Sequence, residues 1–198
     1  MQKLLAAIAI LAVAVTSASA GDVYVVDKTR SEARFEVRYF YQRITGKMKD
    51  IHGALLLDAT NPGASSVTFS IVVDSLDTGS AGLNQQLRSA YGLNAAKFAK
   101  ISFRSTSISK TARLNVYHVA GELTLHGVTR RVTLPVEVVR VVQDGEGLAG
   151  AWFLVRTTLN RKDYGITWNS LLDRADLLVG DDVKLTVNLV ASKTVATP

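Results

Sequence analysis

The 198-residue sequence contains no cysteine, which excludes disulfide bonds and any zinc site that uses thiolate ligands. Histidine is scarce, and no pair among His52, His118 and His126 has the four-residue helical spacing of a zinc site. The chain also lacks the Gly-x-Ser-x-Gly turn that exposes the serine of an α/β-hydrolase. Acidic residues are plentiful, but none form an evident catalytic pair. The sequence therefore predicts a protein that is not an enzyme and has no metal or cofactor.

A long hydrophobic run occurs only at the N-terminus. Lys3 is followed by an apolar run over residues 4–15 and by the small residues Ala18-Ser19-Ala20. This is the layout of a secretory signal peptide over residues 1–20, because the run is too short to span the ~30 Å hydrocarbon core of a bilayer. The mature chain, residues 21–198, is expected to be a single domain with no stable membrane anchor. The predicted location is the periplasm, or the medium after secretion.

Basic residues outnumber acidic ones, 23 against 17, but they are scattered along the chain. They fall mostly on the polar positions of alternating segments, and they form no basic run of the kind that follows a nucleic-acid backbone. We therefore expect no nucleic-acid partner.

The clearest pattern is a strand, a tight turn and a second strand over residues 121–138. Leu123 and Leu125 alternate with polar residues before Gly127, and Val132 and Leu134 do so after it. Side chains of a strand point alternately to opposite faces, so this hairpin has one apolar face and must belong to a larger antiparallel sheet. His126 is expected to be solvated at the tip. His118, spaced evenly with Leu114 and Val116, is expected to point inward.

Similar alternation predicts strands over most of the remaining chain. The candidate strands are residues 23–27, 31–40, 48–59, 67–73, 100–106, 114–120, 149–159 and 183–189. Leu83 and Leu87 interrupt this pattern with helical spacing, and Asp77 or Ser80 could cap the helix. The pattern predicts an all-β fold, an eight-stranded antiparallel β-barrel with one or two short helices, in which closure removes the exposed strand edges. A β-sandwich is the alternative.

Residues 145–150, Gly-Glu-Gly-Leu-Ala-Gly, match the glycine fingerprint of dinucleotide-binding folds by letters alone. That fingerprint needs a helix after it, so that the pyrophosphate meets the helix N-terminus. Here a strand pattern follows, which favours a hairpin turn.

Five short segments carry a family resemblance over nearly the whole mature chain. They are SLDTG (75–79), ISFRST (101–106), GELTLHGVT (121–129), RKDYGI (161–166) and VGDDV (179–183). They are similar to the S-[IL]-D-T-G, I-x-F-x-S-T, G-x-L-T-[IL]-x-G-V-T and R-x-[DE]-[FY]-G-I segments, and to the start of the last strand, of the YceI-like family of bacterial polyisoprenoid-binding proteins.

The resemblance implies a lipocalin-like barrel that holds a long isoprenoid or fatty lipid in its lumen and has no catalytic residues. The chain departs from the family in the predicted helix, where LNQQL (83–87) replaces an R-D-x-H-L segment. Tyr91-Gly92-Leu93 stands where D-F-F is usual, Ala99 replaces a proline, and Arg30-Ser31 replaces an early His-Ser.

We expect the ligand to contact the apolar strand faces. The candidate lumen lining is Phe35, Val37, Phe69, Ile71, Ile101, Phe103, Leu123, Leu125, Val136, Phe153, Val155, Leu185 and Val187. These side chains could equally fill the barrel as a packed core, which would make the protein a ligand-free structural or partner-binding domain. A homodimer is also possible.

Overall fold

The computed structural model describes residues 21–58, 60–145, 147–167 and 179–194. The strands are β1 (Asp22–Val26), β2 (Glu32–Tyr39), β3 (Gln42–Met48), β4 (Ile51–Leu57), β5 (Ser66–Val72), β6 (Leu76–Asp77), β7 (Lys100–Lys110), β8 (Val116–Leu125), β9 (Val128–Asp144), β10 (Gly147–Asn160) and β11 (Val179–Lys193). Within these residue ranges the strands are connected by one α-helix, α1 (Ala81–Arg88), and by three 3-10 turns, η1 (Pro62–Ala64), η2 (Val73–Ser75) and η3 (Arg161–Tyr164).

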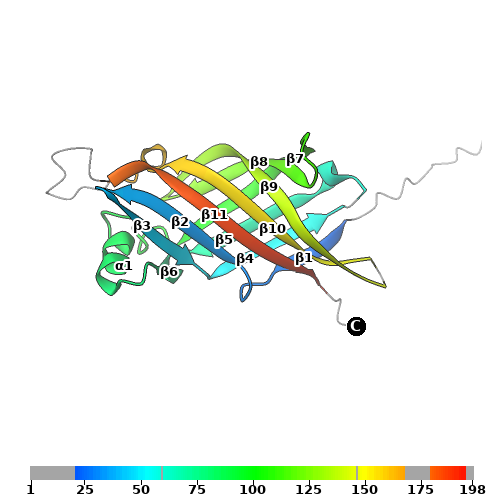
Figure 1. The fold of residues 1–198 in the computed structure, drawn as a ribbon, viewed down its shortest axis with the longest axis horizontal. Helices are drawn as coiled ribbons and strands as arrows, with labels where there is room; N and C mark the ends of the chain where they lie inside the picture. Colours follow the sequence, from blue (N-terminus) through cyan, green and yellow to red (C-terminus); the bar gives the residue numbers. More distant parts are fainter. Residues whose placement is uncertain (1–20, 59, 146, 168–178, 195–198) are drawn as a thin grey trace, which may run out of the picture.

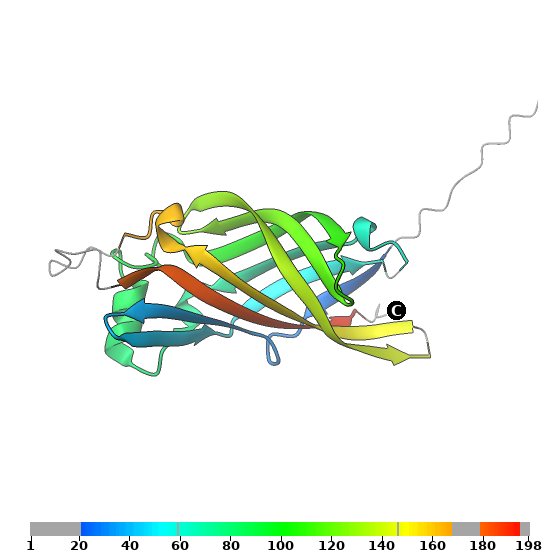
Figure 2. The same ribbon diagram turned by 45° about the horizontal axis from the view of Figure 1, so that its top comes forward.

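The strands close into an antiparallel barrel of eight staves, in which three staves are broken into two strands each (Figures 1 and 2). β11 pairs with β1 at residues 191–193 and with β2 over residues 183–188, so β1 and β2 make one stave. In the next stave, β4 pairs with β1, and β3 pairs with β2. In the third stave, β5 pairs with β4, and β6 pairs with β3. The staves follow chain order around the ring. The eight-stranded barrel predicted from the sequence is therefore confirmed over the sandwich.

The break between β1 and β2 is held by side-chain hydrogen bonds. The Asp27 carboxylate accepts from the Thr29 backbone N–H at 2.9 Å, the Thr29 hydroxyl at 2.6 Å and Arg30 Nε at 2.6 Å. The Thr29 and Arg30 side chains lower the pKa of Asp27 to about 2. The hydroxyl of buried Ser31 accepts a hydrogen bond from the Val190 N–H at 3.0 Å. This bond satisfies a backbone N–H of β11 at the break between β1 and β2, where no backbone partner is available.

The predicted hairpin is formed by β8 and β9, which pair from Val116–Glu137 to Leu125–Val128. Its two turn residues, His126 and Gly127, have φ of 52° and 76°, the pattern of a type I′ turn. β9 and β10 form a second hairpin, so a strand follows the glycine-rich segment as predicted.

The strands differ from the prediction at two places. Residues 42–48 form β3, a strand that the sequence reading missed between two predicted strands. His118 is exposed, because β8 is one uninterrupted strand and keeps a single alternation that turns Val119, Gly121 and Leu123 inward. The histidine therefore falls on the outer face.

One end of the barrel, near the N-terminus of β1, is filled with large side chains. Tyr24 and its register partner Leu55 are 1% and 3% exposed, and Phe103, 2% exposed, stacks on the Phe69 ring at 5.4 Å between centroids. The Tyr24 hydroxyl donates to the Leu148 carbonyl at 2.7 Å, and burial raises its pKa. This end is a packed core. Within the described residues, no helix is both long and apolar enough to cross a membrane.

Candidate functional site

The opposite end of the barrel, next to α1, contains an apolar cavity of about 180 Å³ that is partly open to solvent. One water molecule needs only about 10–15 Å³ of such space, so this cavity is far larger than a packing defect. Its lining is Ala33, Arg34, Phe35, Val37, Met48, Phe69, Ile71, Leu76, Leu87, Gly92, Leu93, Ile101, Leu123, Leu125, Leu134, Val155, Thr157, Leu159, Arg161, Ile166, Val179, Val183, Leu185 and Val187.

The structure brings most of the candidate lining residues together at this cavity. Those in its wall are Phe35, Val37, Phe69, Ile71, Ile101, Leu123, Leu125, Val155, Leu185 and Val187. Phe103, Val136 and Phe153 lie outside the wall: Phe103 is 2% exposed against Phe69, and the other two pack beside the buried core. Alternation identifies the inward face of a strand but not the depth at which the core ends and the cavity begins.

Several wall residues were not predicted, because they lie on segments without strand periodicity or on the strand that was missed. Met48 ends β3, Leu76 begins β6, and Leu93 and Ile166 lie in connections. Leu87 carried a usable signal, since its spacing from Leu83 already marked the buried face of a short helix.

Helix α1 closes one side of the cavity despite its departure from the family pattern. Ser80 caps it by accepting from the Leu83 N–H at 3.4 Å, and buried Leu87 faces the cavity. Asn84 accepts from the Thr78 N–H at 2.8 Å and from the Thr78 hydroxyl at 2.7 Å, and the Arg88 guanidinium donates to the Leu76 carbonyl. Ser80, Asn84 and Arg88 together therefore fix the helix against the side of the cavity.

Gly92 allows the chain after α1 to fold back onto the helix. A Cβ at this position would lie 2.3 Å from the Leu87 carbonyl oxygen, an impossible contact. The Leu93 N–H bonds to that same carbonyl at 2.7 Å, which places Leu93 in the cavity wall. A glycine is thus needed for the wall to form.

We expect Gly92→Ala to lower the free energy of unfolding by about 1–3 kcal/mol, because backbone must shift to admit the methyl group. Gly82→Ala is the matched control: nothing lies within 4 Å of the added methyl, and the site is inside α1. That change should stabilise by about 0.5–1 kcal/mol through helix propensity. Urea unfolding of both variants measures the difference in their free energies of unfolding. Equal changes in the two variants would contradict the close approach of residue 92 to the Leu87 carbonyl.

Among the residues that the structure describes, Arg161 is the one buried cation at the cavity, 7% exposed. Its guanidinium donates to the carbonyls of Ile166 at 2.8 Å, Gly180 at 3.1 Å and Val179 at 3.3 Å, and lies 3.1 Å from the Asp181 carboxylate. In the sequence, one of these acceptors precedes residues 168–178 and the others follow them. The arginine joins the end of β10 to the start of β11, and Asp181 balances its charge.

The neighbouring η3 turn is fixed to the β8–β9 hairpin. The Asp163 carbonyl accepts from Arg130 Nε at 2.6 Å, and His126 Nδ1 lies 3.2 Å from the Tyr164 carbonyl. The His126 ring also meets Phe98 edge-on at 4.7 Å, so the histidine is half-buried, not solvated as predicted. Arg130 Nη2 also lies 3.9 Å from the Asp163 carboxylate, so one arginine contacts both the backbone and the side chain of this turn residue.

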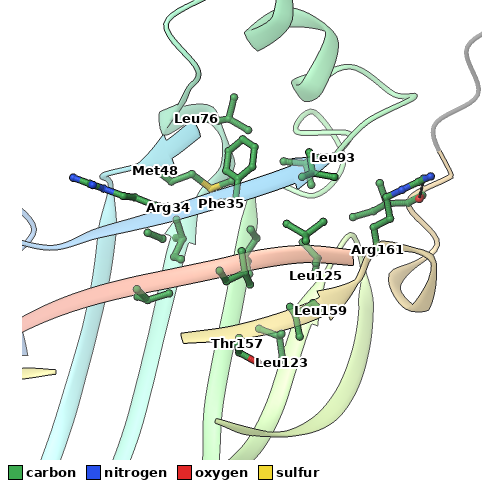
Figure 3. Close-up of a pocket in the computed structure, with 18 of the residues that line it drawn as sticks. Arg34, Phe35, Met48, Leu76, Leu93, Leu123, Leu125, Thr157, Leu159 and Arg161 are labelled. Atoms are coloured by element: carbon green, nitrogen blue, oxygen red, sulfur yellow. Dashed lines mark hydrogen bonds between the residues drawn. The ribbon is translucent and has the colours of Figure 1, made fainter. Parts of the chain in front are cut away.

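The described wall of the cavity presents very few polar groups. Apart from Arg161, its polar side chains are Thr157 and Arg34, and the Arg34 guanidinium points away from the other wall residues (Figure 3). Burial raises the pKa of nearby Tyr164, which therefore stays protonated at neutral pH. Such a wall can remove apolar groups from water, but it brings no acid–base pair together within the described part of the cavity.

A closed antiparallel barrel with an apolar chamber under one end belongs to the broad class of cavity-forming β-barrels that includes the lipocalins. Residues 24–191 match the model of the YceI-like domain. The chain belongs to the YceI-like family.

Sequence relatives agree with this assignment. A UPF0312 protein of Enterobacter sp. strain 638 is 35% identical over 171 residues, which cover 84% of this chain and 88% of that protein. Protein YceI of Salmonella arizonae is 34% identical over 155 residues, covering 77% and 80% of the two chains.

Solved structures show the same fold at lower identity. BcnA of Burkholderia cenocepacia has a TM-score of 0.74 at 24% identity, covering 84% of this chain and 99% of that chain. A polyisoprenoid binding domain from Saccharophagus degradans, implicated in plant cell wall breakdown, has a TM-score of 0.68 at 16% identity, covering 86% and 98%.

Proposed function

We propose that the barrel binds a long apolar ligand, a polyisoprenoid or a fatty-acid-like lipid, and stores, carries or sequesters it. The observation that carries this proposal is the hollow end of the barrel, whose wall is almost entirely hydrocarbon. Each CH₂ group moved from water into such a site contributes about 0.8 kcal/mol, so a chain can bind well with few polar contacts. The Saccharophagus degradans domain, which has this fold and is described as polyisoprenoid binding, supports the ligand class.

A fluorescent prenyl or fatty-acid probe tests this function. The purified protein should bind the probe saturably, with one probe per chain, and an unlabelled isoprenoid should displace it. Absence of saturable binding by a folded, delipidated sample would favour the alternative, a ligand-free structural or partner-binding domain.

We further propose that the protein works outside the cytoplasm after removal of residues 1–20. The basic residue, the short apolar run and the Ala18-Ser19-Ala20 segment support this location, although residues 1–20 lie outside the described residues. Intact-mass measurement of protein from the periplasm or medium should show a chain that begins at Gly21. A mass that retains Met1 to Ala20 would contradict the proposed export.

A further inference from the structure

The turn between β2 and β3 carries three consecutive exposed aromatic residues. Tyr39, Phe40 and Tyr41 are 38%, 45% and 104% exposed, and the rings of Tyr39 and Phe40 meet edge-on at 5.0 Å. Clusters of large exposed apolar side chains are rare on surfaces that bind nothing. The turn is therefore a candidate interaction surface.

The backbone of this turn is strained at Phe40, above a register pair of arginines, Arg38 and Arg43. Phe40 has φ of 52°, a conformation that a bulky residue rarely adopts and that glycine normally supplies in a two-residue turn. Backbone strain of this kind persists mainly where it serves a function.

The turn lies at the cavity end of the barrel. Tyr39 is on the same strand face as Ala33, Phe35 and Val37, all of which line the cavity, so it continues the apolar wall outward. Figures 1 and 2 both place the β2–β3 turn and α1 at the same end of the barrel. There Tyr91, 69% exposed, directly precedes the wall residues Gly92 and Leu93.

The turn segment itself is basic: between Glu36 and Asp50 the chain has four basic residues and no acidic one. The acidic residues beside it, Glu36, Asp181 and Asp182, line a surface pocket together with Arg38, Arg43 and Lys184. Glu36 is contacted by Arg43 at 2.8 Å and by Lys184 at 3.6 Å. Aromatic rings that project beyond a pair of arginines match a bilayer interface, where tyrosines sit at headgroup level and anionic lipids attract basic side chains.

We propose that the β2–β3 turn, residues 38–43, docks on the surface of a bilayer that contains anionic lipids. Phe40 and Tyr41 enter the headgroup region, and Arg38 and Arg43 lie against lipid phosphates. Docking in this orientation faces the cavity end of the barrel toward the membrane. It does not depend on the proposed ligand, but it would give a lipid tail a short path between bilayer and cavity.

Vesicle flotation with the mature chain tests the proposal. We expect the parent to bind vesicles of phosphatidylethanolamine and phosphatidylglycerol, with binding that weakens as salt rises. The double variant Phe40→Gly/Tyr41→Ser should bind at least about tenfold more weakly, because it removes the apolar area. It should also fold at least as well as the parent, since glycine suits the positive φ of residue 40.

Leu114→Ser is the matched control. Leu114 is 89% exposed in the β7–β8 connection at the other end of the barrel, so its loss should leave vesicle binding unchanged. The proposal is overturned if the parent protein does not bind the vesicles, even if it binds a protein partner instead. It is also overturned if the double variant binds the vesicles as tightly as the parent does. Probe binding without vesicles tests the cavity separately, so each proposal can fail alone.

Discussion

Arg161→Met is expected to lower the free energy of unfolding by about 3–5 kcal/mol, one of the largest single effects available in this chain. The guanidinium is 7% exposed and serves three backbone carbonyls and one carboxylate. Methionine fills a similar volume but donates no hydrogen bond, so these acceptors lose their partner while remaining largely shielded from water. Urea unfolding followed by circular dichroism measures the loss.

Lys162→Met is the control for that experiment. Lys162 contacts the same Asp181 carboxylate at 3.0 Å, but its side chain is 41% exposed and solvent screens the pair. This change should cost less than about 1 kcal/mol. If both variants lose the same stability, buried hydrogen bonding at Arg161 is not what joins β10 to β11.

Leu185→Asn is expected to abolish binding of an apolar probe while leaving the barrel folded. Leu185 lies in the cavity wall, and its register partners Phe35 and Thr157 lie in the wall on either side. An amide there would meet a bound hydrocarbon chain without a partner, at a cost of about 2–7 kcal/mol. Without ligand the amide faces a cavity that is partly open to solvent, so the fold should tolerate it.

Lys184→Asn provides the comparison, because it introduces the same residue one position earlier, on the outer face of β11. Lys184 is 65% exposed, so its replacement should leave probe affinity unchanged. Circular dichroism should show both variants folded before titration. Equal probe binding by Leu185→Asn and the parent would place the ligand outside the cavity.

The barrel itself could be predicted from the sequence, because strand alternation reports directly on which side chains face inward. Prediction and structure agree best at the β8–β9 hairpin, where polar and apolar residues alternate along two strands that pair without interruption. β3 was missed because its apolar positions, such as Ile44 and Met48, are separated by Gly46 and basic residues. A Cβ at Gly46 would lie 2.4 Å from the Phe35 ring, so a larger residue there would have to displace that ring.

The candidate site was harder to predict than the fold. Phe103 and Ile101 belong to the same alternating set on β7, yet one is buried against Phe69 and the other lines the cavity. Periodicity cannot separate them, because the boundary between core and cavity depends on contacts across the barrel. For the same reason Phe103→Asn would test packing in the filled half, and Leu185→Asn is the sharper test of binding.

Contacts made by connecting segments were beyond sequence reasoning altogether. Arg161 meets backbone carbonyls 5 to 19 residues away, and Gly92 is needed only because the chain returns to the Leu87 carbonyl. Hydrogen bonds to backbone carbonyls do not depend on the residue types that carry those carbonyls, so they cannot be predicted from the sequence pattern. A buried arginine in a short polar turn therefore cannot be distinguished from an exposed one.

Native mass spectrometry of the protein, purified without detergent from the periplasm of its own source, tests most directly whether the hollow end of the barrel holds an apolar ligand. We expect a second species whose added mass matches one isoprenoid or fatty lipid per chain, and which is lost in Leu185→Asn but kept in Lys184→Asn. A parent protein found only at the mass of the bare chain, and unable to bind an added isoprenoid, would contradict the proposed function.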